Sequence, residues 1–214
     1  VGEVWLGSGQ SNMSFRVNQT FTPNNVTPDP SLRLFDMRER WETNDVVWSE
    51  AAIDSTKHLL YYKDAAWQIA DAAAAKKFSA VAYYYGKMLR DSLQVPVGLI
   101  CNSVGGSTTE SWIDRNTLET QLPAILSNWL HNDFIQEWCR VRCALNLGLK
   151  GKTFNDDFQH RHPYEPCYLF EAGILPLAQY PIKGAIWYQG ESNAHNMEAH
   201  EKLFPMLVNS WRAY

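Results

Sequence analysis

The sequence predicts an α/β fold, a three-layer αβα sandwich of the flavodoxin-like kind around a mainly parallel sheet. Three short apolar runs, residues 4–6, 97–101 and 185–188, indicate buried strands, and each is followed by a polar turn that contains glycine. Helical periodicity between the runs gives the order βα…βα…βα, which implies parallel strands covered on both faces. The 214 residues, of which 45% are hydrophobic, suit a single domain.

The first half of the chain contains further elements between these strands. We expect a surface loop over 18–30, a strand after Ser31 and an irregular insertion over 42–77. A helix is predicted over 79–94. Its inward face is expected to consist of the apolar residues Val81, Tyr84, Tyr85, Met88, Leu89 and Leu93.

The second half shows helix start and stop signals. Asp114 is predicted to cap a short helix, and Asn132 or Asp133 a longer one that ends at Gly148. The inward face of that longer helix is expected to hold Phe134, Ile135, Trp138, Val141 and Leu145. A polar loop over 150–166, a short helix over 168–175 before Pro176, and a last helix after Asn196 complete the chain.

The most informative motif is Gly9-Gln10-Ser11-Asn12-Met13, which directly follows the first strand. A serine in a glycine turn at the carboxyl end of a strand stands where open α/β sheets place reactive groups. The hydroxyl of Ser11 is therefore a candidate nucleophile, with Ser8 as a weaker rival. The alternative interpretation is an ordinary Ser/Asn helix cap.

The turns after the other two strands supply complementary groups. Residues 102–107 offer glycine N–H groups, and residues 189–193 offer amide side chains. Because parallel strands end at one edge of a sheet, the three turns together provide a nucleophile and the donors of an oxyanion hole.

This constellation resembles the SGNH hydrolases, and more closely their sialate O-acetylesterase and acetylxylan esterase branch. The residues that carry the resemblance are 3–13, 98–107, 110–113 and 183–193. The resemblance implies that Ser11 is the nucleophile and that its N–H and that of Gly106 (or Gly105) hold the oxyanion. Gln189 or Asn193 would be the third donor, and we favour Gln189 because it comes first after the strand.

Other residues of the motifs are expected to support this site. Glu191 can bind the amide of Gln10 or Asn12 and hold the first turn in place, or act as a general base. Trp112 is expected to form a wall of the pocket.

The resemblance leaves the base unassigned. The family supplies an Asp-x-x-His motif near its C-terminus, and no such motif follows Asn193. The chain also begins at its first strand without a signal peptide, so we expect a fragment of one SGNH-type esterase domain that lacks its last strand and that loop. One Asp-x-x-His motif occurs earlier, from Asp157 to His160, with His162 close behind. This segment is a polar loop, part of a rearranged active site, or the site of a metal-assisted hydrolase.

Composition narrows the function further. The net charge of −4 argues against a nucleic-acid partner, and no apolar run is long enough to span a membrane. We expect free cysteines, no metal and no organic cofactor. The expected activity is removal of O-acetyl groups from sialic acid or another acetylated glycan, in a secreted or periplasmic protein by the resemblance. A non-catalytic carbohydrate-binding module is the rival hypothesis, and the oligomeric state stays open.

Overall fold

The computed structural model describes residues 2–23, 26–149 and 160–214. Two compact units share the chain. The first, here called the sheet unit, comprises Val1–Arg38, Lys63–Gly105 and Tyr180–Gln189. The second, here called the helical unit, comprises Glu39–Tyr62, Gly106–Gln179 and Gly190–Tyr214.

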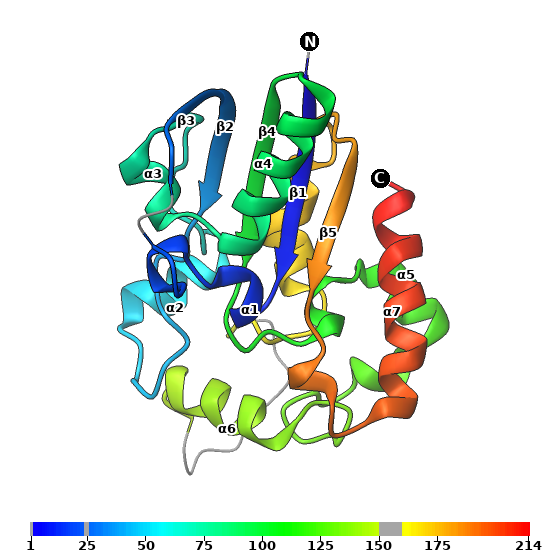
Figure 1. Cartoon of the computed structure of the whole chain (residues 1–214). Helices are drawn as coiled ribbons and strands as arrows, with labels where there is room; N and C mark the ends of the chain where they lie inside the picture. The colour runs from blue at the N-terminus through cyan, green and yellow to red at the C-terminus, as the bar shows by residue number, and fades with distance from the viewer. Residues whose placement is uncertain (1, 24–25, 150–159) are drawn as a thin grey trace. The chain divides into compact units, whose positions relative to one another are not determined.

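The sheet unit contains five strands in the order β3-β2-β4-β1-β5 (Figure 1). Their bounds are β1 Glu3–Gly9, β2 Asp29–Met37, β3 Gln68–Ala70, β4 Val97–Ser103 and β5 Gly184–Tyr188. β1 runs parallel to β4 and β5, β2 runs parallel to β4, and only β3 pairs antiparallel, with β2. The predicted α/β class and mainly parallel sheet are confirmed, and helices flank the sheet as expected for an αβα sandwich.

The strands differ in burial according to their place in the sheet. All seven residues of β4 are buried, as expected for a strand paired on both sides. We predicted that β5 is also buried, and this is wrong: Ala185 and Tyr188 are exposed. β5 is an edge strand, because none of the described segments pairs with its second side.

Helices α1 (Ser11–Ser14), α3 (Ala72–Lys77) and α4 (Ala80–Leu93) belong to the sheet unit, with α4 lying across the sheet in Figure 1. The predicted inward face of α4 is confirmed only in part: Val81 and Leu89 pack against the core, whereas Tyr84, Met88 and Leu93 are exposed. The helix instead buries Ala80, Ala82, Tyr83 and Gly86. A Cβ on Gly86 would lie 2.5 Å from a methyl of Leu99, so close approach to the sheet selects small residues.

The helical unit contains α2 (Glu50–Lys57), α5 (Arg115–Gln121), α6 (Glu137–Asn146) and α7 (Met197–Arg212). Short 3₁₀ or π turns also lie in it: η2 Thr109–Trp112, η3 Pro123–Ile125, η4 Phe170–Ile174, η5 Leu175–Leu177 and η6 Glu191–Asn193. The side chain of Asp114 accepts a hydrogen bond from a backbone N–H group of α5, which confirms the predicted cap. The last helix, α7, begins after Asn196 as predicted, and the Asn196 side chain caps it.

Three other predictions are corrected. α6 begins at Glu137, so neither Asn132 nor Asp133 caps it, and it buries Cys139 and Cys143 while Val141 is exposed. The insertion over 42–77 is not irregular, since it holds α2, β3 and α3. The described end of the polar loop, from Arg161 onward, is buried.

Two further features bear on function. All four cysteines are buried and free, as predicted. Among the residues that the structure describes, no helix has the length and apolar character needed to cross a membrane.

Candidate active site

The backbone at the end of β1 directs Ser11 outward. Gly9 has φ +140, and a Cβ there would lie 2.1 Å from the carbonyl oxygen of Tyr188, so only glycine fits. The next residue, Gln10, donates its N–H to that carbonyl oxygen at 3.1 Å. The chain then turns into α1, whose first residue is the exposed Ser11.

The two candidate serines differ in access to solvent. Ser8 lies inside β1 with no exposed surface, and its hydroxyl has no hydrogen-bond partner among the described residues. Ser11 is exposed at the edge of the sheet. A substrate can therefore reach Ser11 without any opening of the sheet, whereas Ser8 is out of reach.

The ends of the neighbouring strands lie beside this serine. Gly9 is opposite Ser103 of β4 and opposite Tyr188 of β5. Adjacent strands are about 4.8 Å apart, so the turns that carry Gly105 and Gln189 start on either side of the turn that carries Ser11. Within the sheet unit, the three strand ends thus meet at one edge, as the sequence predicts.

Gly106 is the first residue of the helical unit after Gly105. It has φ +74, and a Cβ there would lie 2.4 Å from the hydroxyl oxygen of Tyr164. Its carbonyl oxygen accepts a hydrogen bond from the Ser192 hydroxyl at 3.1 Å. Contacts with Tyr164 and Ser192 thus constrain the conformation of Gly106 within its unit. The role of Gly106 as an oxyanion donor stays a prediction.

Asn193 belongs to a buried network of the helical unit. Its amide nitrogen donates to Glu110 at 2.8 Å, and its amide oxygen accepts from the backbone N–H of Thr109 at 2.9 Å. The Thr109 hydroxyl also lies 3.3 Å from Nδ1 of His200. Because both ends of the Asn193 amide are engaged and the residue is 2% exposed, the geometry favours Gln189 as the third donor.

The sequence analysis assigned no role to Glu110. In the structure, this residue is a fully buried carboxyl group. Burial raises its pKa, and one of its oxygens has no hydrogen-bond partner among the described residues. The only available signal was a carboxylate inside a segment, residues 107–113, that otherwise lacks charge.

The predictions for the residues that were expected to support the site are tested to different degrees by the structure. Trp112 is fully buried, and its indole N–H donates to the Ser107 hydroxyl at 3.0 Å. It therefore packs inside the helical unit, which argues against the predicted pocket wall. Gln10 is buried, Asn12 is half-buried and Glu191 is exposed, and the predicted bond between Glu191 and one of these amides stays a prediction.

His162 is held as a neutral ring in the helical unit. The backbone N–H of Tyr164 donates to its Nδ1 at 3.0 Å, and its Nε2 lies 3.1 Å from the amide oxygen of Asn146. Burial lowers its pKa from 6.5 to about 3. With both ring nitrogens engaged, His162 is a poor base and a poor metal ligand.

The hypothesis of a metal-assisted hydrolase therefore loses one of its three residues. Asp157 lies outside the described residues, so only His160 remains of the proposed set. The part of the chain that the structure describes has no group of three His, Cys, Asp or Glu side chains able to hold a metal ion.

Both the sequence and the fold of the chain match known proteins. Residues 1–138 match the family described as "Carbohydrate esterase, sialic acid-specific acetylesterase". The chain belongs to this carbohydrate esterase family. The resemblance predicted from the three motifs is thereby confirmed, and the match includes the turns that hold Ser11 and Gly105.

Individual members of the carbohydrate esterase family agree. The chain is 31% identical to the sialate O-acetylesterase of Mus musculus and 29% identical to that of Homo sapiens, with 99% of the chain aligned. It spans 39% of the mouse protein and 35% of the human protein. A solved carbohydrate acetylesterase from Xanthomonas citri covers the whole chain at 26% identity with a TM-score of 0.66, and the chain covers 39% of it.

Proposed function

We propose that the protein is a serine esterase that removes O-acetyl groups from carbohydrates, either sialic acid or another acetylated glycan, and releases acetate. One observation carries the proposal: exposed Ser11 lies at the carboxyl end of β1, between the strand ends that lead to Gly105 and Gln189. The printed names of the relatives, sialate O-acetylesterase and carbohydrate acetylesterase, support this substrate class.

The proposed chemistry is acyl transfer in two steps. The hydroxyl oxygen of Ser11 attacks the acetyl carbonyl carbon while a histidine base, which we do not assign to a residue of this chain, takes the proton. The N–H groups of Ser11 and of Gly106 (or Gly105) and the Gln189 amide hold the negative oxygen. The sugar hydroxyl then leaves with a proton, and water attacks the acetyl-serine to release acetate.

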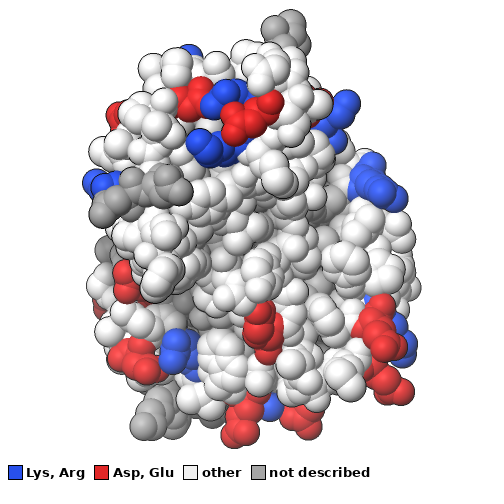
Figure 2. All heavy atoms as spheres, in the orientation of Figure 1, with Lys and Arg blue, Asp and Glu red and all other residues white. Residues whose placement is uncertain are grey.

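This reaction needs no metal ion and no organic cofactor, because a serine, a base and hydrogen-bond donors are sufficient for it. The proposed partner is an acetylated carbohydrate. Figure 2 shows Lys and Arg interspersed with Asp and Glu on the visible face rather than gathered in one basic patch. That mixed charge suits a sugar ligand, while the absence of a nucleic-acid partner stays a prediction.

Two predictions from the resemblance remain part of the proposal. One is that the chain forms a single esterase domain with further residues supplying its base. The other is a secreted or periplasmic location, which fractionation of the source cells followed by detection of the protein would test.

The decisive experiment compares the two serines. Ser11→Ala should abolish acetate release from an O-acetylated sialic acid and hydrolysis of an aryl acetate. Ser8→Ala is the matched control, because it also removes a serine hydroxyl, three residues before Ser11. This variant should retain most of the turnover. An active Ser11→Ala variant would refute the assignment. Both variants are made in the full-length protein, which supplies the base. Binding of the glycan with no turnover in the unaltered full-length protein would instead support the non-catalytic binding module.

A further inference from the structure

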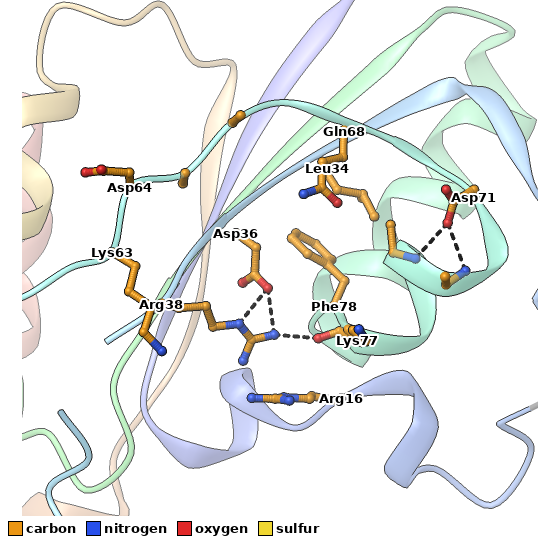
Figure 3. Close-up of a pocket in the computed structure, with 14 residues that line it drawn as sticks. Arg16, Leu34, Asp36, Arg38, Lys63, Asp64, Gln68, Asp71, Lys77 and Phe78 are labelled. Atoms are coloured by element: carbon orange, nitrogen blue, oxygen red, sulfur yellow. Dashed lines mark hydrogen bonds and ion pairs between the residues drawn. The ribbon is translucent and has the colours of Figure 1, made fainter. Parts of the chain in front are cut away.

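The sheet unit contains an open groove of about 730 Å³ beside the end of β2 (Figure 3). Its walls come from the segment after α1, from the end of β2, from residues 63–68 and from α3. The buried rings and chains of Leu34 and Phe78 line its apolar part. Its charged lining residues are Arg16, Arg38, Lys63 and Lys77 and the carboxylates Asp36, Asp64 and Asp71.

Two of the three carboxylates bind cationic or N–H groups of the protein itself. Asp36 forms an ion pair with Arg38 at 2.6 Å. Asp71 caps α3, because its carboxylate accepts hydrogen bonds from the N–H groups of Ala73 and Ala74, both at 2.8 Å. Figure 3 shows both arrangements, and it shows the carboxylate of Asp64 pointing away from Asp36 and Arg38.

The remaining cations lack such compensation. Arg16, Lys63 and Lys77 line the groove, yet none of them has an ion-pair partner within 4 Å among the described residues. With Arg38 paired to Asp36, the groove lining has these three cations and the two carboxylates Asp64 and Asp71, a local net charge of +1 in a chain whose overall net charge is −4. Lining of this kind favours a negatively charged ligand, for which an arginine offers a planar fork of donors.

The groove lies at the same edge of the sheet as Ser11. Met37 at the end of β2 is opposite Asn102 of β4, and Asn102 is opposite Ser8 of β1. Two strand spacings of about 4.8 Å therefore separate the end of β2 from the end of β1, or roughly 10 Å. Arg16 also follows Ser11 by only five residues.

We propose that this groove binds an anionic substituent of the glycan, a carboxylate or a sulfate, at a distance from the ester that Ser11 attacks. Arg16, Lys63 and Lys77 hold the negative charge of this substituent. The position of the groove relative to the substrate depends on the proposed esterase function, whereas its preference for anions does not.

Calorimetric titration of the protein tests the preference without any turnover. N-acetylneuraminic acid is compared with its neutral methyl ester, and glucose 6-sulfate with glucose, so each pair differs in one charge. We expect the anionic member of at least one pair to bind more tightly, and the pair that responds identifies the anion. Equal affinities within both pairs would overturn the proposal.

Substitutions then place the binding at the groove. Arg16→Gln combined with Lys63→Gln should weaken binding of the anionic sugar about tenfold or more, because the variant loses two charged hydrogen-bond donors, and should not change binding of the neutral sugar. Lys183→Gln is the matched control, because that lysine precedes β5 at the opposite edge and its side chain is 63% exposed. Equal weakening by Lys183→Gln would refute the site.

Different measurements test the esterase proposal and the groove proposal. Acetate release by the unaltered protein tests the esterase, and calorimetry in the Ser11→Ala background tests the groove. Loss of the anion preference with intact turnover would refute only the groove. An anion preference that depends on Arg16 and Lys63 in a full-length protein without turnover would leave the groove established and refute the esterase.

Discussion

Mild acid should destabilise the protein through His162. The Asn146 amide nitrogen donates to the carbonyl oxygens of Asn44 and Val46, at 2.8 and 2.7 Å, so its oxygen must face the histidine and accept the Nε2 proton. Nδ1 already accepts the N–H of Tyr164. A second proton on the ring would break that hydrogen bond and leave a buried charge, which explains why the fold favours the neutral form.

The size of the effect follows from the pKa. Since the pKa of His162 falls from 6.5 to about 3 on folding, its contribution to stability is present above pH 6.5 and is lost as the pH falls. Between pH 7 and pH 5 the loss amounts to about 2 kcal/mol by linkage. Burial raises the pKa of Glu165 from 4.5 to about 6 despite Arg161 at 2.7 Å, which opposes the loss by about 1 kcal/mol.

A comparison of variants removes the contribution of Glu165. His162→Gln cannot titrate, so the stability difference between the unaltered protein and this variant should shrink by about 2 kcal/mol from pH 7 to pH 5. Urea unfolding followed by tryptophan fluorescence measures it, and His131→Gln, at an exposed histidine, is the control. A difference that stays constant with pH would show that His162 is not held neutral.

Three further predictions concern the site. Gln189→Ala should lower kcat by about 10²–10³ with little change in KM, whereas Asn193→Ala should mainly lower the unfolding temperature; steady-state kinetics and thermal unfolding distinguish them. Gly9→Ala should unfold the end of β1, because its Cβ would lie 2.1 Å from the oxygen of Tyr188, and a normal unfolding temperature would contradict this. Glu110→Gln should gain stability relative to the unaltered protein as the pH rises above 4.5, since burial raises the pKa of that carboxyl, and urea unfolding at pH 4 and 7 checks the sign.

Local signals explain which elements the sequence could predict. The strand ends, the Asp114 cap and the start of the last helix after Asn196 depend on a few adjacent residues, and these are confirmed. The inward face of α4 was predicted from its largest apolar residues and is only partly right, since Val81 and Leu89 pack against the core but Met88 does not. The distance between this helix and the sheet is set by Gly86 against Leu99, a contact between distant segments that periodicity does not encode.

In the candidate site, too, local sequence patterns indicate some features and not others. The turn at Ser11 could be recognised from five consecutive residues, and the structure adds its exposure and the glycine that it needs. The bonds of Asn193 to Glu110 and Thr109 join residues 83 and 84 positions apart, so no local pattern indicates them. Because that network engages the Asn193 amide, it adds a physical reason to the prediction that Gln189 is the donor, which the sequence based on chain order alone.

The precision of the proposed nucleophile turn derives from the sheet rather than from side chains. Gln10 donates its N–H to the Tyr188 carbonyl, and the N–H of Val104 donates to the Gly9 carbonyl at 3.0 Å, so backbone bonds join all three strand ends. Sites built on such rigid elements hold reacting groups more closely than sites on loops. The backbone carries no information about the sugar, however. Under the proposed function, selectivity among glycans comes from side chains, and the cationic residues Arg16, Lys63 and Lys77 of the groove lie along the same edge of the sheet.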